Sequence, residues 1–157
     1  MQPNNITRML DAHQIPYHAY ELPREKIGAL EAAEILGVAP EQVYKTIVVT
    51  REKPGKPILA VVAGPDEVDL KALAKAMGEK KVTLATEREA ERLTGLQAGG
   101  ISPLALINKG FQVVLDETSG LHEEIYISGG QRGLDIRLPV DALVTLTHAI
   151  TAPISHF

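Results

Sequence analysis

The chain has 157 residues, 45% of them hydrophobic and 23% charged, and these proportions argue against a disordered chain, a collagen-like chain or a coiled coil. With 16 basic and 20 acidic residues its net charge is −4, which disfavours broad, unspecific binding to nucleic acid. The absence of cysteine excludes disulfides, thiol nucleophiles and cysteine-ligated zinc, so any chemistry must use other groups.

Length and polarity together predict one cytoplasmic domain over residues 1–157. Residues 1–10 are polar and lack the apolar segment of a signal peptide. No stretch approaches the roughly 20 apolar residues that a membrane span needs. We therefore expect no membrane partner.

Two short helices are predicted before residue 40. Asn5 is placed to cap the first, because an asparagine side chain can accept hydrogen bonds from the free N–H groups of a helix start. The apolar face of this helix would carry Ile6, Met9, Leu10 and His13. The second helix spans Ala29–Leu36 and ends at Gly37, because glycine readily adopts the left-handed conformation that terminates helices.

A β-hairpin is predicted next. Lys45–Arg51 and Ile58–Ala63 are short, β-branched and almost continuously apolar, as is typical of strands buried on both faces. The segment between them, Lys53–Pro57, contains a Pro-Gly pair flanked by lysines and predicts an exposed turn.

Two further helices follow the hairpin. Asp69 precedes an apolar series at helical spacing, and Gly78 follows it. The members of this series are Leu70, Leu73, Ala74 and Met77. Thr86 and Glu89 have the spacing of a capping box ahead of a short helix that ends near Gly95.

The second half of the chain is rich in predicted strands. Phe111–Asp116, Glu124–Ser128 and Leu134–Leu138 are apolar runs bounded by glycine or aspartate, and a last helix begins near Asp141. Together these elements predict a mixed α/β fold with a mixed sheet.

The common catalytic templates do not fit this sequence. Ser102 stands in Gly-Ile-Ser-Pro-Leu, which lacks the second glycine of a nucleophile elbow, and Pro103 removes a backbone N–H that would help to form an oxyanion hole. The five histidines show no close-spaced set of metal ligands, and the glycines at 129–133 lack the dinucleotide-binding spacing. We therefore expect neither a metal nor a nucleotide cofactor.

Lys45 is the candidate functional residue that spacing alone singles out. If residues 43–50 form a strand, Lys45 shares a face with Val43, Ile47 and Val49, so its charge is directed along an apolar surface. The lysine must then pair with an anion, reach solvent in a cleft, or titrate with a lowered pKa. The alternative is a strand-end lysine whose stem lies on the core and whose ammonium reaches water.

Two glycine-rich stretches form a second candidate site. Gly99–Pro103 and Ser128–Asp135 expose backbone N–H groups that could approach a carbonyl or a phosphate closely. The alternative is that both are ordinary turns, the second of which joins two predicted strands.

With these motifs in view, the sequence resembles the YbaK/EbsC family of aminoacyl-tRNA deacylases, nearly end to end. Several separate motifs occur in the family's order, which makes the resemblance specific. They are His18–Glu21, Gln42–Thr46, Asp69–Lys71, Gly99–Leu104, Ile125–Gly130 and Arg132–Ile136.

The resemblance implies a fold, an activity and a set of site residues. The fold would be a mixed barrel-like β-sheet with flanking helices, related to the editing domain inserted in bacterial prolyl-tRNA synthetases. Lys45 would be the essential catalytic lysine. The residues around the aminoacyl and adenosine pocket would be Tyr20, Thr46, Gly99, Gly100, Ile101, Ser102, Ser128, Gly129, Gly130, Arg132 and Asp135.

The implied reaction is removal of cysteine from mischarged Cys-tRNA(Pro), with Cys-tRNA(Cys) as a further candidate substrate. In the family's mechanism the substrate thiol attacks its own ester carbonyl, so that the protein supplies orientation and charge but no nucleophile. The implied partners are the acceptor end of the tRNA and, transiently, prolyl-tRNA synthetase. Two alternatives stay open: a hydrolase of Ala-tRNA(Pro), and a non-catalytic module that binds aminoacyl-tRNA or a synthetase.

Overall fold

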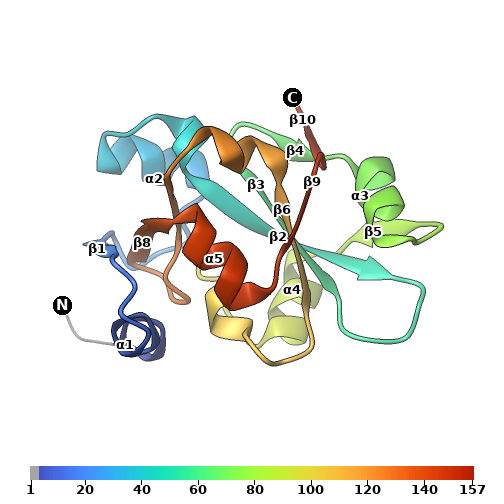
Figure 1. Ribbon diagram of the computed structural model, residues 1–157, viewed down its shortest axis with the longest axis horizontal. Coiled ribbons are helices and arrows are strands. Elements are labelled where there is room, and N and C mark those ends of the chain that lie inside the picture. The colour runs from blue at the N-terminus through green and yellow to red at the C-terminus, as the bar shows by residue number, and fades with distance from the viewer. Residues whose placement is uncertain (1–3) are drawn as a thin grey trace.

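Two β-sheets that face each other across a shared core form the centre of the molecule (Figure 1). The computed structural model describes residues 4–157. The larger sheet has the order β5-β2-β3-β6-β9, the smaller has the order β1-β8-β7, and β10 and β4 form a short pair. The strands are β1 (His18–Glu21), β2 (Tyr44–Arg51), β3 (Ile58–Ala63), β4 (Glu67–Val68), β5 (Val82–Leu84), β6 (Gln112–Asp116), β7 (Glu124–Ser128), β8 (Leu134–Pro139), β9 (Ile150–Ala152) and β10 (Ser155–His156).

The predicted hairpin forms the middle of the larger sheet. Strands β2 and β3 pair antiparallel, with Lys45 opposite Val62 and Val49 opposite Ile58. Strand β6 then pairs parallel with β3, and β9 pairs parallel with β6, so the sheet is mixed as predicted. All six residues of β3 are buried, because the strand has neighbours on both sides and apolar clusters on both faces.

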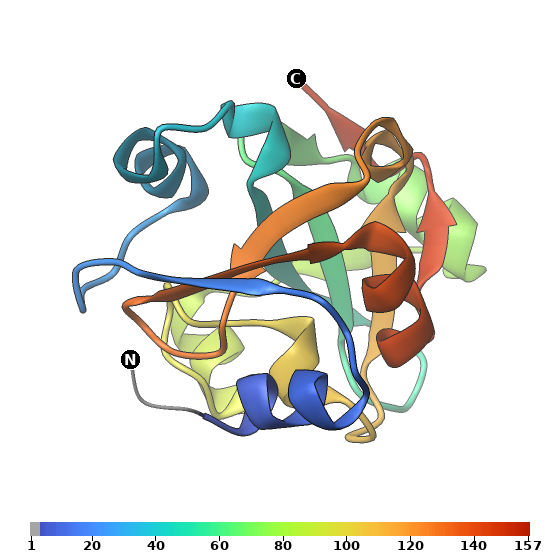
Figure 2. The same ribbon diagram turned by 60° about the vertical axis from the view of Figure 1, so that its left-hand side comes forward.

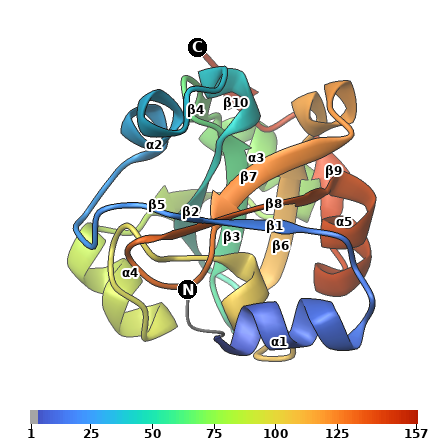
Figure 3. The same ribbon diagram turned by 90° about the vertical axis from the view of Figure 1, so that its left-hand side faces the viewer.

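The smaller sheet closes over the larger one. Figures 2 and 3 show β1, β8 and β7 crossing in front of β2 and β3. A parallel bridge between Val43 and Tyr126 joins the two sheets just before β2 begins. The main core lies between them, and the fold is therefore the mixed, barrel-like arrangement that was predicted. Its members include Val48, Leu59 and Leu115 from the larger sheet and Ile127 and Ile136 from the smaller.

Five α-helices surround the sheets within the described residues. They are α1 (Asn5–Ala12), α2 (Ala29–Leu36), α3 (Leu70–Met77), α4 (Glu87–Thr94) and α5 (Val140–Thr147). Gly37, Gly78 and Gly95 end α2, α3 and α4 in the left-handed conformation. No helix within residues 4–157 combines the length and the apolar character needed to cross a bilayer.

The predicted cap of α1 is wrong by one residue. The N-cap is Asn4, whose side chain accepts a hydrogen bond from the Thr7 N–H, and Asn5 is the first helical residue. Asn4 also donates from Nδ2 to the carbonyl of Gly129, at 3.0 Å. The cap of α1 thereby holds the glycine stretch that follows β7.

Candidate active site

A cavity of about 330 Å³ opens beside the N-terminal half of β2. Its walls come from five parts of the chain: residues 43–48, the start of α2, the start of α4, the loop at 98–101, and the facing ends of β7 and β8. The apolar part of the wall includes Ile27, Ala29 and Ala90, while Lys45, Glu87 and Asp135 supply charged groups. The cavity is thus largely apolar with a few polar groups directed into it, as is usual for small-molecule sites.

The cavity exists because β2 is longer than its neighbour β5. The two strands pair from Val49 to Arg51, and the carbonyl of Val48 accepts a hydrogen bond from Ala85 on that side. Alternate residues of a strand direct their backbone N–H and C=O groups to the same side. Those of Thr46 therefore face the same side of β2 as those of Val48. Among residues 4–157 no strand pairs with Thr46 on that side. Thr46 therefore offers a backbone donor and acceptor to a ligand in the cavity.

Lys45 reaches the cavity from the same strand. Its Nζ donates to the carbonyl of Gly64 at 3.0 Å, and the side chain is half-buried. None of the ion pairs within the described part of the chain includes this ammonium. An ammonium has three N–H donors, so Lys45 keeps donors for an anionic or carbonyl-bearing ligand.

The predicted alternation along β2 is confirmed within the strand. Tyr44 and Val48 pack into the main core, whereas Ile47 and Val49 pack on the opposite face with α3. Val43 differs from the prediction, since it precedes β2 and packs with α2 and Tyr126 in a third cluster. Its backbone bridge to Tyr126 turns it away from the face that Ile47 and Val49 share.

Asp135 is a buried acid on the far wall of the cavity. It lies on β8 between Tyr20 of β1 and Ser128 of β7, and it is only 8% exposed. Burial disfavours the ionised form and raises the pKa of the Asp135 carboxyl to about 6. A cationic ligand group in the cavity would therefore stabilise the ionised form of this carboxyl, which burial alone disfavours.

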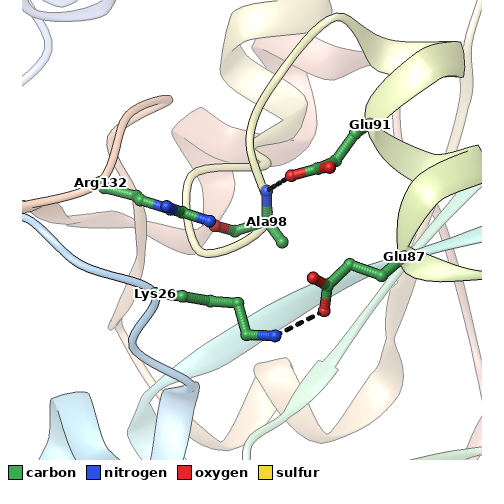
Figure 4. A network of polar contacts seen from close by, with 5 residues as sticks. All are labelled: Lys26, Glu87, Glu91, Ala98 and Arg132. Carbon is green, nitrogen blue, oxygen red and sulfur yellow. Dashed lines mark hydrogen bonds and ion pairs between the residues drawn. The ribbon is translucent and has the colours of Figure 1, made fainter.

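The two glycine-rich stretches pack against each other at one end of the cavity. A Cβ on Gly100 would lie 2.9 Å from the backbone of Gln131, so only glycine allows this approach. Arg132 donates from Nε to the carbonyl of Ala98 at 2.7 Å, and Glu91 accepts from the Ala98 N–H at 2.8 Å (Figure 4). The stretches are turns, as the alternative held, and they pack directly against each other.

Six of the twelve residues singled out in the sequence line the cavity: Lys45, Thr46, Gly99, Ile101, Ser128 and Asp135. The other six do not line it. Ser102 is fully buried and accepts a hydrogen bond from the Leu104 N–H, which caps a short 3₁₀ helix. Gly129 and Gly130 line a separate cavity beside α1, and Tyr20 packs against Tyr126 with the two rings tilted by 46°. The remaining two, Gly100 and Arg132, hold the loops together.

An ion pair at the cavity was not foreseen in the sequence. Lys26 Nζ lies 2.7 Å from Glu87 Oε2 and joins the segment before α2 to the first turn of α4 (Figure 4). Glu87 also lines the cavity. Both side chains are more than half exposed, so the pair contributes at most about 1 kcal/mol and can open readily. Within residues 4–157 no three His, Asp or Glu side chains gather as metal ligands would.

The sequence also matches a known family model. The model described as the aminoacyl-tRNA editing domain matches residues 26–146. The chain belongs to the aminoacyl-tRNA editing domain family. This confirms the resemblance, the mixed α/β fold and the predicted class of enzyme, an aminoacyl-tRNA deacylase.

Individual relatives agree with the family. The candidate Cys-tRNA(Pro)/Cys-tRNA(Cys) deacylase EbsC of Enterococcus faecalis is 37% identical over 98% of this chain and 94% of its own length. The crystal structure of a candidate trans-editing enzyme for prolyl-tRNA synthetase aligns over 100% of both chains, with a TM-score of 0.80 and 27% identity. A proline–tRNA ligase of Thermodesulfovibrio yellowstonii is 30% identical over 69% of this chain, which covers only 18% of the ligase.

The contact at Gly100 gives the first testable prediction for this editing domain. In Gly100→Ala the new methyl group would press on the backbone of Gln131 and Arg132, which cannot rotate away as a side chain can. We expect about 1–3 kcal/mol of lost stability in urea unfolding and at least about tenfold slower deacylation, because the cavity wall shifts. Gly120→Ala is the matched control, since its Cβ meets nothing within 4 Å. Equal behaviour of the two variants would contradict the prediction.

Proposed function

We propose that this editing domain removes cysteine from mischarged Cys-tRNA(Pro). The observation that carries the proposal is the convergence of Lys45 and Asp135 on one cavity beside the open edge of β2. The 37% identity with a candidate Cys-tRNA(Pro)/Cys-tRNA(Cys) deacylase supports the choice of amino acid. Cys-tRNA(Cys) is a further candidate substrate on the same ground.

The cavity supports a reaction in which the substrate supplies the nucleophile. The cysteine sulfur attacks its own ester carbonyl, a C–S bond forms, the ester C–O bond breaks, and the thiol proton ends on the ribose oxygen. The products are a cysteine thiolactone and free tRNA. The hydroxyl groups of Thr46 and Ser128 border the cavity, but among residues 4–157 neither hydroxyl forms a hydrogen bond with a His, Asp, Glu or Lys side chain that would activate it as a nucleophile.

The protein's part in this reaction is orientation and charge. Lys45 holds the negatively charged acceptor end in place, because its ammonium has one carbonyl partner and free donors. Asp135 receives the α-ammonium of the aminoacyl group, whose charge offsets the cost of ionising a buried carboxyl. The backbone N–H groups of Gly99 and Ile101, which form no hydrogen bond among residues 4–157, and the open edge at Thr46 support the developing oxyanion and fix the ester.

A comparison of three esters tests the substrate and the reaction together. Cys-tRNA(Pro), Ala-tRNA(Pro) and Ser-tRNA(Pro) are incubated with the protein, and the released amino acid species is identified by mass. We expect cysteine to leave at least about 100-fold faster than serine or alanine, and to leave as the thiolactone, because intramolecular attack needs a thiol at this distance. Preferential loss of alanine would instead make the protein an Ala-tRNA(Pro) hydrolase. An unchanged half-life of all three esters would leave a module that binds without turnover.

A transient complex with prolyl-tRNA synthetase is part of the same proposal. The chain resembles a segment that some proline–tRNA ligases carry within their own sequence. A separate editing domain must reach the same mischarged tRNA before it enters translation, and association with the synthetase would bring it there.

A further inference from the structure

Five exposed lysines gather at the end of the larger sheet that lies away from Lys45. They are Lys53, Lys56, Lys80, Lys81 and Lys109, and we call them the lysine patch. They come from three separate segments: the β2–β3 turn, the turn between α3 and β5, and the loop before β6. A local excess of positive charge in a chain of net charge −4 is a marked asymmetry.

Specific contacts hold these segments together. Lys53 Nζ donates to the carbonyl of Gly78 at 2.7 Å, which ties the hairpin to the α3–β5 turn. Lys56 Nζ lies 5.4 Å from the ring centroid of Phe111, which places it beside the loop that carries Lys109. Figure 1 shows the hairpin loop and β5 on the same side of the molecule, far from α1.

The acidic residues of this region do not cancel the charge of the patch. Glu79 has a side chain that is 1% exposed, and it lies 3.3 Å from Arg51 and 3.7 Å from Lys53. Its charge is therefore matched internally, mainly by Arg51. Glu52 is the exposed acid of the hairpin turn. Within residues 4–157, Lys56, Lys80, Lys81 and Lys109 form no ion pair.

Lys80 and Lys81 of the patch lie along the same β5 edge of the larger sheet as the cavity, whereas Lys56 and Lys109 lie just before β3 and β6. Ala85 lines the cavity, and Lys81 precedes it by four residues, immediately before β5. At about 3.3 Å per residue of extended chain, Lys81 is about 13 Å from the cavity wall. Arg51, at the hairpin end of β2, is about 20 Å from Lys45 on the same scale. A strand of RNA whose last nucleotide occupies the cavity spans these distances with its next few nucleotides.

We propose that the lysine patch binds the backbone phosphates of the tRNA acceptor arm, a few nucleotides before the esterified end. The inference rests on the proposed function, because it needs an aminoacyl-tRNA in the cavity. Phosphate contacts position a nucleic acid without reading its sequence. The patch would therefore raise the affinity for any tRNA equally, while the cavity selects the amino acid.

Two double variants and two substrates test the patch. Lys80→Gln with Lys81→Gln, and Lys56→Gln with Lys109→Gln, are assayed on Cys-tRNA(Pro) and on cysteine esterified to adenosine alone. On the tRNA we expect kcat/KM to fall about 5- to 30-fold for each double variant. The plot of log binding constant against log salt concentration should become shallower by about 0.7–0.9 for each lost phosphate contact. On the adenosine ester we expect no change, because that substrate does not reach the patch.

Charge-preserving and distant variants are the controls. Lys80→Arg with Lys81→Arg keeps both charges and should keep wild-type kcat/KM, since the contact is with phosphate. Arg8→Gln removes a charge from α1, far from the patch, and should leave kcat/KM unchanged on both substrates.

The possible outcomes separate the patch from the proposed function. Equal losses of kcat/KM on both substrates, or no loss on either, would contradict the proposal that the lysine patch binds tRNA. If the wild-type protein cleaves neither substrate, the proposed function fails, and equilibrium binding of uncharged tRNA at several salt concentrations still tests the patch. Unchanged tRNA binding together with lost binding to phosphatidylserine vesicles would overturn the RNA assignment in favour of an anionic membrane surface.

Discussion

Lys45→Ala is expected to lower kcat/KM for Cys-tRNA(Pro) by about 10²–10³, the usual cost of removing one charged or hydrogen-bonding group that acts at the reacting centre. The stability should change by less than about 1 kcal/mol, because the half-buried ammonium has one carbonyl partner, Gly64, and its removal leaves no buried charge. Single-turnover deacylation and urea unfolding of the same sample measure the two effects. A large loss of activity in a stably folded variant identifies Lys45 as part of the chemistry.

Two further substitutions sharpen this experiment. Lys45→Arg keeps the charge but replaces a compact ammonium with a wide, planar guanidinium, so it should also fail to restore full activity in a cavity of about 330 Å³. Lys75→Ala removes an exposed lysine from α3 and should leave the rate unchanged. A wild-type rate of deacylation by Lys45→Ala would show that the lysine takes no part in the mechanism. The alternative interpretation, a strand-end lysine whose ammonium reaches water, would then hold.

The elements that the sequence predicted well have signals that are local. The capping box of Thr86 and Glu89 and the terminating Gly95 lie within ten residues of each other, and α4 has the predicted bounds. Ile58–Ala63 is likewise a strand as predicted, because an unbroken β-branched run next to a Pro-Gly turn leaves few other conformations.

The errors occur where a distant contact decides between local alternatives. Asn4 and Asn5 are adjacent and chemically equal as caps, and Asn4 is the one that reaches the carbonyl of Gly129, 125 residues away. The short strands β5 and β9 have three residues each and carry little signal of their own. They are strands because β2 and β6 present free edges to them.

The candidate site shows the same division. Lys45 could be singled out from alternation within one strand, since a charge on an apolar face is visible in the sequence. Asp135 and Ser128 come together with it only because the two sheets meet at the bridge between Val43 and Tyr126. Glu87 looks like any helix N-terminal acid in the sequence, and only the tertiary fold places it at the cavity.

Asp135→Asn is expected to make the protein more stable and less active. In the folded protein burial raises the pKa of Asp135 to about 6, whereas in the unfolded chain the carboxyl titrates near 3.8. Between these values the folded state holds a proton that the unfolded state has lost, so stability falls as the pH rises from 4 to 6. Above pH 6 the full cost, at most about 3 kcal/mol, remains. Asparagine carries no charge and avoids this cost. In urea unfolding, the free energy of unfolding gained by the variant over wild type should therefore be about 1–3 kcal/mol larger at pH 7.5 than at pH 4.

The activity of the same variant tests why the fold keeps so costly a group. If the carboxylate receives the substrate's α-ammonium, wild-type kcat/KM should rise with pH around an apparent pKa near 6, and Asp135→Asn should lose both this rise and about 10²-fold of kcat/KM at pH 7.5. Asp141→Asn, on the exposed first turn of α5, is the control and should show neither the gain in stability nor the loss of activity. A stabilised variant with unchanged kinetics would show that Asp135 borders the cavity without touching the ester. A stabilised and inactive variant would mean that this editing domain keeps a destabilising buried acid because each substrate brings a cationic group to it.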